Sequence, residues 1–278
     1  MRRRPLSGLA ALAVGTVLTV TACSGGGGDA APSVSPRATT TASAAVSGGS
    51  ADNAGLTADN FVQRVAAAEK SQKTFRMTIS MKVLGQEITM DSAMDLRHGA
   101  GAIDETVSVP GQQDFTVRGV DGLYYVNYGP RSKNKWIVVD PKDPKDPLGK
   151  QFAALKATSP ADQVEAMRCA LVSVEAEGAP TTLRGEDVQK YVVTMDTSKV
   201  GAALTEQFQA GVAQLPKTLT YAYWVGASDD LPRKVTAEIA GMSMTMTTGH
   251  WGEPVTITAP SKGDLLPGGL DSLSALES

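Results

Sequence analysis

Two runs of alternating residues constrain the fold of this chain more than any other feature of its sequence. In residues 75–83 large apolar side chains alternate with polar ones, and the pattern returns in residues 86–95 after a short link at Gly85-Gln86. Successive side chains of a β-strand point to opposite faces of the sheet, so a period of two predicts strands with one apolar and one polar face. The short glycine-containing link predicts that the two strands form an antiparallel hairpin.

The rest of the chain predicts a mixture of short strands and amphipathic helices. Further strands are expected at about 101–109, 114–120, 122–127, 135–139, 171–176, 181–185, 187–195, 219–225, 235–239, 242–247 and 255–258. Helical periodicity appears after Thr57, which is suited to cap a helix, and again at 148–155, after Ser159-Pro160 and at 198–214. No linker divides residues 56–260, so we expect one α+β domain with about ten or eleven antiparallel strands. A single sheet of that size should curl strongly or close.

The amino terminus predicts export and lipid attachment. Residues 2–4 are arginines, an apolar run extends from Leu6 to Val20, and Val20-Thr21-Ala22-Cys23 follows. This order is typical of a secretory signal and is too short for a membrane span. The last four residues resemble the lipobox of bacterial lipoproteins, which implies cleavage after residue 22 and acylation of Cys23 on the extracytoplasmic face of the cell membrane. The alternative is an ordinary signal peptide that contains a cysteine.

Composition separates the folded part from its flanks and limits the partners. Residues 23–55 are rich in Ser, Gly, Ala and Thr and predict a disordered tether, and residues 261–278 predict a flexible Gly/Pro-containing tail. Without the three signal arginines the formal net charge changes from −3 to about −6. An acidic chain without a basic cluster argues against nucleic-acid partners and against electrostatic docking on anionic lipid. Membrane attachment must therefore come from the acyl chains on Cys23.

Methionine is concentrated at the apolar positions of the predicted strands. Two interpretations of this pattern stay open: a core that uses methionine as flexible filler, and the wall of a cavity that adapts to a flexible apolar guest. The candidate lining residues are Phe75, Met77, Ile79, Met81, Met90, Met94, Tyr221, Tyr223, Met244 and Met246.

Catalytic, metal and cofactor sites have no support in the sequence. The only histidines are His98 and His250, and neither belongs to a triad or zinc motif. The stretch 140–147 spaces three aspartates evenly but lacks the glycine and bidentate glutamate of a calcium loop, so a stiff solvated loop is expected. Cys169 is interpreted as a small buried side chain, or alternatively as a reactive thiol, because it lies off the apolar stripe of its helix. We expect no enzyme activity, no cofactor and no metal.

Several segments of the chain resemble a known family. Lys135-Trp136-Ile137-Val138-Val139-Asp140-Pro141, the segment 185–196 around Tyr191, and Tyr223-Trp224-Val225 followed by Leu231-Pro232-Arg233-Lys234-Val235 are similar to actinobacterial lipoproteins of the LppX/LprG type, related in fold to the carrier LolA. The resemblance covers about residues 56–260. It implies a half-barrel of antiparallel sheet with helices on its concave side and an apolar cavity for lipid acyl chains. Leu231-Pro232-Arg233 itself is expected to set the register of a strand after a turn.

Two functional hypotheses follow. The first is a membrane-anchored, monomeric lipoprotein that binds, and in its family is thought to shuttle, the acyl chains of lipids or lipoglycans. The second is a non-enzymatic surface module with the same fold and a filled core, which binds a protein or peptide partner.

Overall fold

The computed structural model describes residues 55–276 except for 84, 98–100, 147, 150–151, 153–158, 200–215 and 240. The predicted signal peptide, the predicted lipidation site Cys23 and most of the tether lie outside the described residues. So does most of the predicted helix 198–214, whose first two residues are described as part of the 3-10 helix η2 (Thr197–Lys199).

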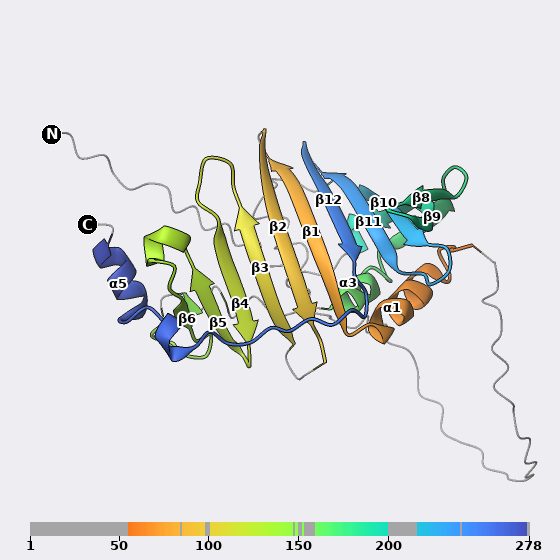
Figure 1. The fold of residues 1–278 in the computed structure, drawn as a ribbon. Helices are drawn as coiled ribbons and strands as arrows, with labels where there is room; N and C mark the ends of the chain where they lie inside the picture. The colour runs from red at the N-terminus through yellow and green to blue at the C-terminus, as the bar shows by residue number, and fades with distance from the viewer. Residues whose placement is uncertain are drawn as a thin grey trace, which may run out of the picture.

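One antiparallel sheet dominates the fold, and the order of its strands in space differs from their order in the sequence (Figure 1). Its strands are β1 (Thr74–Val83), β2 (Gln86–Asp95), β3 (Ala102–Ser108), β4 (Phe115–Val120), β5 (Leu123–Asn127), β6 (Ile137–Val139), β7 (Leu171–Ala176), β8 (Thr181–Leu183), β9 (Glu186–Asp196), β10 (Thr218–Gly226), β11 (Pro232–Ile239) and β12 (Met242–Gly249). The order is β6-β5-β4-β3-β2-β1-β12-β11-β10-β9-β7, and β8 pairs with β9 off this path. The α+β class is confirmed, with 12 strands in place of ten or eleven.

The predicted hairpins form because the turn residues fit their turns. Val83 pairs with Gln86, and Gly85 between them has φ of +82°, which glycine adopts without the strain that a Cβ would add. Asp121 and Gly122 both have positive φ between β4 and β5, as a two-residue hairpin turn requires. Pairing of β1 with β12 then joins the two halves of the chain into one sheet.

Within the described residues, three α-helices and two 3-10 helices besides η2 accompany the sheet. They are α1 (Phe61–Ser71), α3 (Pro160–Ala166), α5 (Gly269–Leu276), η1 (Gly129–Ser132) and η3 (Lys262–Asp264). The predicted cap at Ser159 is confirmed, because its Oγ accepts a hydrogen bond of 3.2 Å from the Asp162 amide. The predicted cap at Thr57 is wrong: α1 begins after Asn60, whose Oδ1 accepts from the Thr57 amide at 2.8 Å, and residues 58–60 form a preceding turn.

Helices α1 and α3 pack together on one face of the sheet at its β9–β12 end (Figure 1). Phe61 of α1 is fully buried and meets Tyr223 of β10 edge to face, with ring centroids 5.3 Å apart. The bidentate ion pair of Arg64 with Asp230, at 2.8 Å for both contacts, holds α1 to the β10–β11 turn. This end of the sheet therefore contains the largest apolar core among the described residues.

The segment after β12 differs from its prediction. Residues 253–261, the C-terminal strap, form no strand at 255–258 and cross the opposite, polar face of the sheet (Figure 1). Arg97 donates to the Val255 carbonyl at 2.7 Å and Arg118 to the Thr258 carbonyl at 3.1 Å, so side chains hold the strap where a strand would use its backbone.

The predicted flexible tail also differs, because residues beyond 261 form η3 and α5. The Trp136 amide donates to the Asp264 carbonyl, and the Leu266 amide donates to the Trp136 carbonyl, both at 2.8 Å. Leu266 and Leu273 are buried against Ile137 of β6. The tail thus covers the edge strand of the sheet, which would otherwise expose unpaired backbone groups.

Candidate functional site

The structure brings all ten predicted lining residues to one face of the sheet, which we call the methionine face. Strand register shows this directly: Ile79 lies between Met90 on β2 and Met246 on β12, and Met81 lies opposite Met244. Phe75 pairs with Met94 on the same face. Helices α1 and α3 pack on this face, over its β9–β12 part.

Two continuous rows of apolar side chains cross the methionine face at right angles to the strands. The first apolar row spans eight strands, through Phe115, Val107, Met90, Ile79, Met246, Val235, Tyr223 and Tyr191. The second apolar row spans seven, through Ile88, Met81, Met244, Ala237, Tyr221, Val193 and Val174. On β9, β10 and β11 both rows belong to the buried core under α1 and α3.

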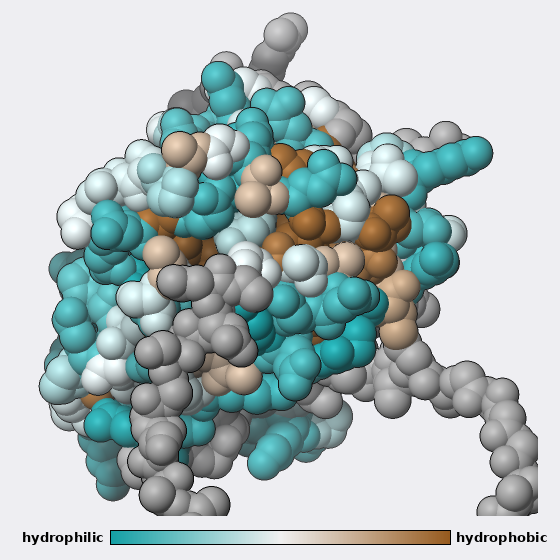
Figure 2. Space-filling model, turned by 90° about the vertical axis from the view of Figure 1, so that its right-hand side faces the viewer, coloured by the Kyte–Doolittle hydropathy of each residue, from teal (hydrophilic) through white to brown (hydrophobic). Residues whose placement is uncertain are grey.

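Burial is incomplete where the rows cross β1 and β12. Met90 on β2 and Val235 on β11 are each 2% exposed, whereas Ile79, Met81, Met244 and Met246 on the adjoining strands β1 and β12 are only partly buried. These four side chains lie where the core under α1 and α3 meets the separate cluster of β2 and β3. Figure 2 shows brown apolar side chains at the surface of the right-hand face of the molecule, framed by polar ones.

A polar pair interrupts the methionine face beside the first apolar row. Ser92 of β2 donates a hydrogen bond of 2.9 Å to the Glu105 carboxylate of β3, and Met77 and Val117 are their neighbours in register. Burial raises the pKa of Glu105, and the hydrogen bond from Ser92 opposes that rise. Ser92 continued the alternating pattern of the sequence, but its pairing with Glu105 was not predicted.

A second carboxyl group, Glu69 of α1, lies where the rows pass under the helix. Its side chain is 6% exposed, and its Oε2 is buried without a hydrogen-bond partner. Burial raises the pKa of Glu69 to about 8. Sequence reasoning missed this residue, although Phe61, Val65 and Glu69 follow one another at intervals of four and therefore share one face of the helix.

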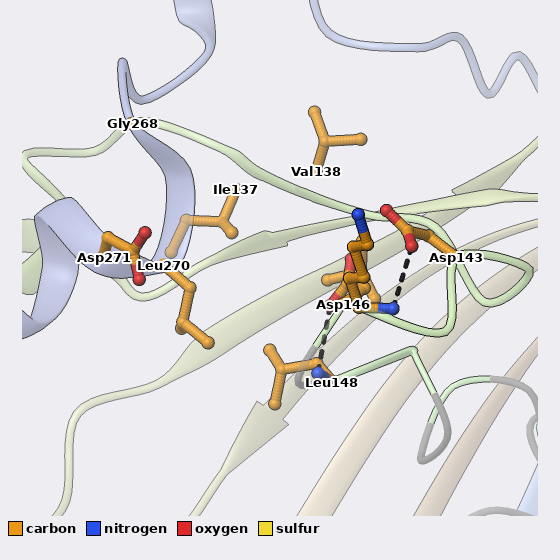
Figure 3. Close-up of a pocket in the computed structure, with 10 residues that line it drawn as sticks. Ile137, Val138, Asp143, Asp146, Leu148, Gly268, Leu270 and Asp271 are labelled. Carbon is orange, nitrogen blue, oxygen red and sulfur yellow. Dashed lines mark hydrogen bonds between the residues drawn. The ribbon is translucent and has the colours of Figure 1, made fainter.

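The pocket nearest the carboxyl-terminal helix is not part of the methionine rows. It has a volume of about 180 Å³ and lies between β6, α5 and residues 143–148 (Figure 3). Its lining mixes apolar side chains such as Ile137 and Leu148 with Asp143, Lys145 and Asp271. This size and polarity do not suit an acyl chain.

The three aspartates of the loop 140–146 accept hydrogen bonds from backbone amides of the same segment. Asp140 accepts from the Lys142 amide at 2.9 Å, Asp143 from the Lys145 amide at 2.8 Å, and Asp146 from the Leu148 amide at 3.0 Å. Asp140 and Asp143 thus close their own local turns, and Asp146 also accepts from the Asp140 amide at 2.9 Å. Within the part of the chain that the structure describes, no three His, Cys, Asp or Glu side chains gather as metal ligands.

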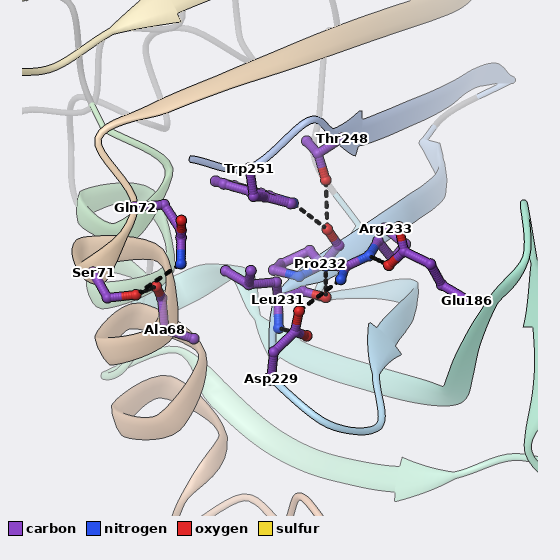
Figure 4. Close-up of polar contacts among 10 residues, drawn as sticks. All are labelled: Ala68, Ser71, Gln72, Glu186, Asp229, Leu231, Pro232, Arg233, Thr248 and Trp251. Atoms are coloured by element: carbon purple, nitrogen blue, oxygen red, sulfur yellow. Dashed lines mark hydrogen bonds and ion pairs between the residues drawn. The ribbon is translucent and has the colours of Figure 1, made fainter. Parts of the chain in front are cut away.

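Leu231-Pro232-Arg233 has the structural role that the sequence predicted (Figure 4). Arg233 is ion-paired with Asp229 at 2.6 Å and with Glu186, and it donates to the Leu231 carbonyl at 3.1 Å. The Pro232 carbonyl accepts from Thr248 Oγ1 at 2.6 Å. These contacts fix the start of β11 against β9 and β12.

The remaining candidates for chemistry are at the surface or undescribed. His250 is exposed and lies 2.9 Å from the Glu253 carboxylate, while His98 lies outside the described residues. Cys169 is exposed, so the prediction of a buried side chain is wrong, in agreement with its position off the helical stripe. Within the described residues, none of the helices combines the length and the apolar character of a membrane span.

Comparison with known proteins finds solved structures of similar fold. No protein-family model matches the sequence, and no curated protein is detectably similar to it. LprF from Mycobacterium bovis matches with a TM-score of 0.53 and 15% identity, over 73% of this chain and 97% of LprF. The chain has the fold of LprF. The lipoprotein LppX from Mycobacterium tuberculosis is also similar, with a TM-score of 0.48 and 12% identity, over 72% of this chain and 98% of LppX.

The match to LprF confirms the resemblance to LppX/LprG-type proteins at the level of fold. It extends over nearly all of LprF, so the α+β sheet with its helices is shared as a whole. At 15% identity the likeness concerns the fold alone, and the function must come from this chain's own residues.

Proposed function

We propose that this protein is an extracytoplasmic lipoprotein, anchored by acylated Cys23, that binds the acyl chains of lipids on its methionine face and catalyses no reaction. The observation that carries the proposal is the pair of apolar rows, which cross most of the sheet and are only partly buried on β1 and β12, where three of the four row residues are methionines. Unbranched, polarizable methionine side chains adapt to a flexible hydrocarbon better than branched ones do.

The helices on the methionine face support a covered site. In this proposal the sheet curls into the half-barrel that the family resemblance implies, and α1 and α3 cover one end of its concave methionine face. An acyl chain lying along the rows would then contact both the sheet and the helices, with the head of the lipid outside. The fold of LprF and the lipobox of this chain support the same reading.

The anchor and tether support a role close to the membrane surface. Two or three acyl chains on Cys23 would hold the protein stably, where a single chain binds only marginally. A coil of about 32 residues reaches on the order of 30 Å, so the domain would meet lipids as they leave the bilayer, and could carry them onward.

Native mass spectrometry of the mature chain carrying Cys23→Ser tests the binding of lipid, because this form lacks acyl chains of its own. We expect adducts with the mass of lipids, and uptake of a fluorescent acyl probe after delipidation. A single lipid-free mass in repeated preparations, together with no probe uptake, would contradict the proposal.

Tryptophan substitutions separate a ligand site from a filled core. If the rows bind lipid, Met81→Trp and Met244→Trp should reduce probe uptake at little cost in melting temperature. If the space is already filled, the same changes should lower stability by about 1–3 kcal/mol through overpacking. Thr245→Trp is the matched control, because it changes the same strand β12 on the opposite face. It should leave probe uptake unchanged.

A further inference from the structure

Two polar groups at the helix-covered end of the rows lack partners. The Glu69 carboxyl is 6% exposed, and no hydrogen bond to either of its oxygens is found among the described residues. The hydroxyl of Tyr221 also has no partner there, although this side chain is only 9% exposed. A buried polar group without a hydrogen bond costs about 1–3 kcal/mol, so Glu69 Oε2, the one buried side-chain oxygen or nitrogen without a partner among the described residues, needs a reason.

Glu69 and the tyrosines form one small cluster. Tyr221 and Tyr223 are two residues apart on β10, and their ring centroids are 6.3 Å apart. Glu69 is close enough to Tyr223 that its charge raises the pKa of that phenol, in addition to the larger effect of burial. Tyr223 donates to the Met167 sulfur at 3.5 Å, a weak acceptor, which leaves its own oxygen able to accept.

The neighbouring charges do not neutralise Glu69. The cations of α1 have other partners: Arg64 pairs with Asp230 at 2.8 Å, and Lys70 with Glu165 at 3.3 Å. On α3, Arg168 also pairs with Glu165, and Asp162 bonds to Ser159. The hydroxyl of Tyr191 on β9 accepts from the Leu56 amide at 3.2 Å. Glu69 therefore faces phenols and apolar groups, which favour its neutral form at pH 7.

The apolar rows lead to this cluster, since Tyr223 belongs to the first apolar row and Tyr221 to the second. A neutral carboxyl group and a phenol can both donate hydrogen bonds, and an ester carbonyl only accepts them. A lipid that follows a row and ends in an ester would supply the acceptor that both groups lack.

We propose that Glu69 and Tyr221 bind the carbonyl group of an acyl ester whose hydrocarbon chain lies along the apolar rows. The proposal rests on the proposed function and adds the class of ligand: acyl esters, in preference to ethers and to ionised fatty acids. An ether lacks the carbonyl oxygen, and a carboxylate would have to leave water for an apolar site.

Two fluorescent lipid analogues of equal chain length, one an ester and one the corresponding ether, test the assignment on the mature Cys23→Ser chain. At pH 7 we expect the ester to bind about 3- to 10-fold more tightly, as one or two neutral hydrogen bonds allow. Glu69→Leu should reduce this preference to about one while ether binding remains. Glu165→Gln, on the adjacent helix α3, should leave the preference unchanged.

The dependence on pH distinguishes hydrogen bonding from a change in shape. In the unmodified cluster the ester preference should fall as the pH rises from 7 to 9.5, because an ionised Glu69 cannot donate. Glu69→Gln keeps a donor that does not titrate, so its preference should persist across this range. An unchanged ester preference in Glu69→Leu would overturn the assignment, as would tighter binding of palmitate than of methyl palmitate at pH 7. Failure of both analogues to bind would instead contradict the proposed function.

Discussion

Glu69 makes the stability of the ligand-free protein depend on pH in a direction opposite to that of most carboxylates. Its pKa is about 8 in the folded protein and 4.5 as the ordinary value, because burial disfavours the charge. The folded state therefore holds this proton more tightly than the unfolded chain does. Stabilisation is complete below pH 4.5, is lost as the pH rises from 4.5 to 8, and levels off above that.

The magnitude follows from the shift. One pKa unit corresponds to about 1.4 kcal/mol, so a rise from 4.5 to about 8 amounts to at most about 5 kcal/mol. Most of this change in the free energy of unfolding, about 3–4 kcal/mol, is expected between pH 5 and pH 8, where it can be measured. Local loosening of the last turn of α1 would reduce the value without changing its sign.

Urea unfolding of the Cys23→Ser chain with and without Glu69→Gln, at pH 5, 6, 7, 8 and 9, measures the effect. Glutamine has nearly the same shape and does not titrate, so the stability difference between the two proteins isolates the carboxyl group. We expect Glu69→Gln to gain relative stability steadily from pH 5 to 8 and to stay level at pH 9. Parallel stability profiles over this range would refute the reasoning.

Three further predictions concern other parts of the molecule. Arg233→Ala should lower the free energy of unfolding by about 1–3 kcal/mol, measured in urea, because it removes charge-assisted bonds from a side chain that is 12% exposed. Leu273→Ala should speed amide hydrogen exchange in α5 and β6 first, because Leu273 is buried against Ile137 at the sheet edge. Cys23→Ser should move the protein from the membrane to the soluble fraction with its melting temperature unchanged.

Each of these has a control within the same chain. Arg131→Ala is the control for Arg233→Ala. Arg131 lies on η1, between β5 and β6 in the chain, and these two strands are far from β11 in the sheet. Probe affinity should be unchanged in both variants. Exchange in α1 should not respond to Leu273→Ala; equal acceleration there would indicate global unfolding. Membrane fractionation of Cys23→Ser like that of the unaltered protein would disprove the anchor.

Local pattern was enough to predict most of the sheet and its apolar face. Because side chains alternate strictly along a strand, Ile79 and Met81 had to share one face of β1, and Met90 and Met94 had to share one face of β2. The turns at Gly85 and Asp121-Gly122 followed from the need for positive φ, and Ser159 capped its helix as its residue type favours. Short-range rules decide these features, and the sequence contains them in full.

The pairing of strands that are far apart in the sequence was decided only by the tertiary structure. Nothing local shows that β1 pairs with β12, and that pairing places Met81 opposite Met244 and makes the apolar rows continuous. The strap that replaced a predicted strand at 255–258 depends on Arg97 and Arg118, which are remote in sequence. The tail beyond residue 261 folds where Trp136, just before the edge strand β6, offers it backbone partners and Ile137 offers an apolar contact.

Glu69 combines one property that the sequence determines with another that only the tertiary structure determines. By itself the sequence determines that its side chain lies on the buried side of α1, four residues after Val65, because the helical period fixes its direction. It cannot determine that Tyr223 lies close to it, or that the nearby cations are held by Asp230 and Glu165. A pKa depends on burial and on neighbouring charges, and both are properties of segments that meet only when the chain has folded.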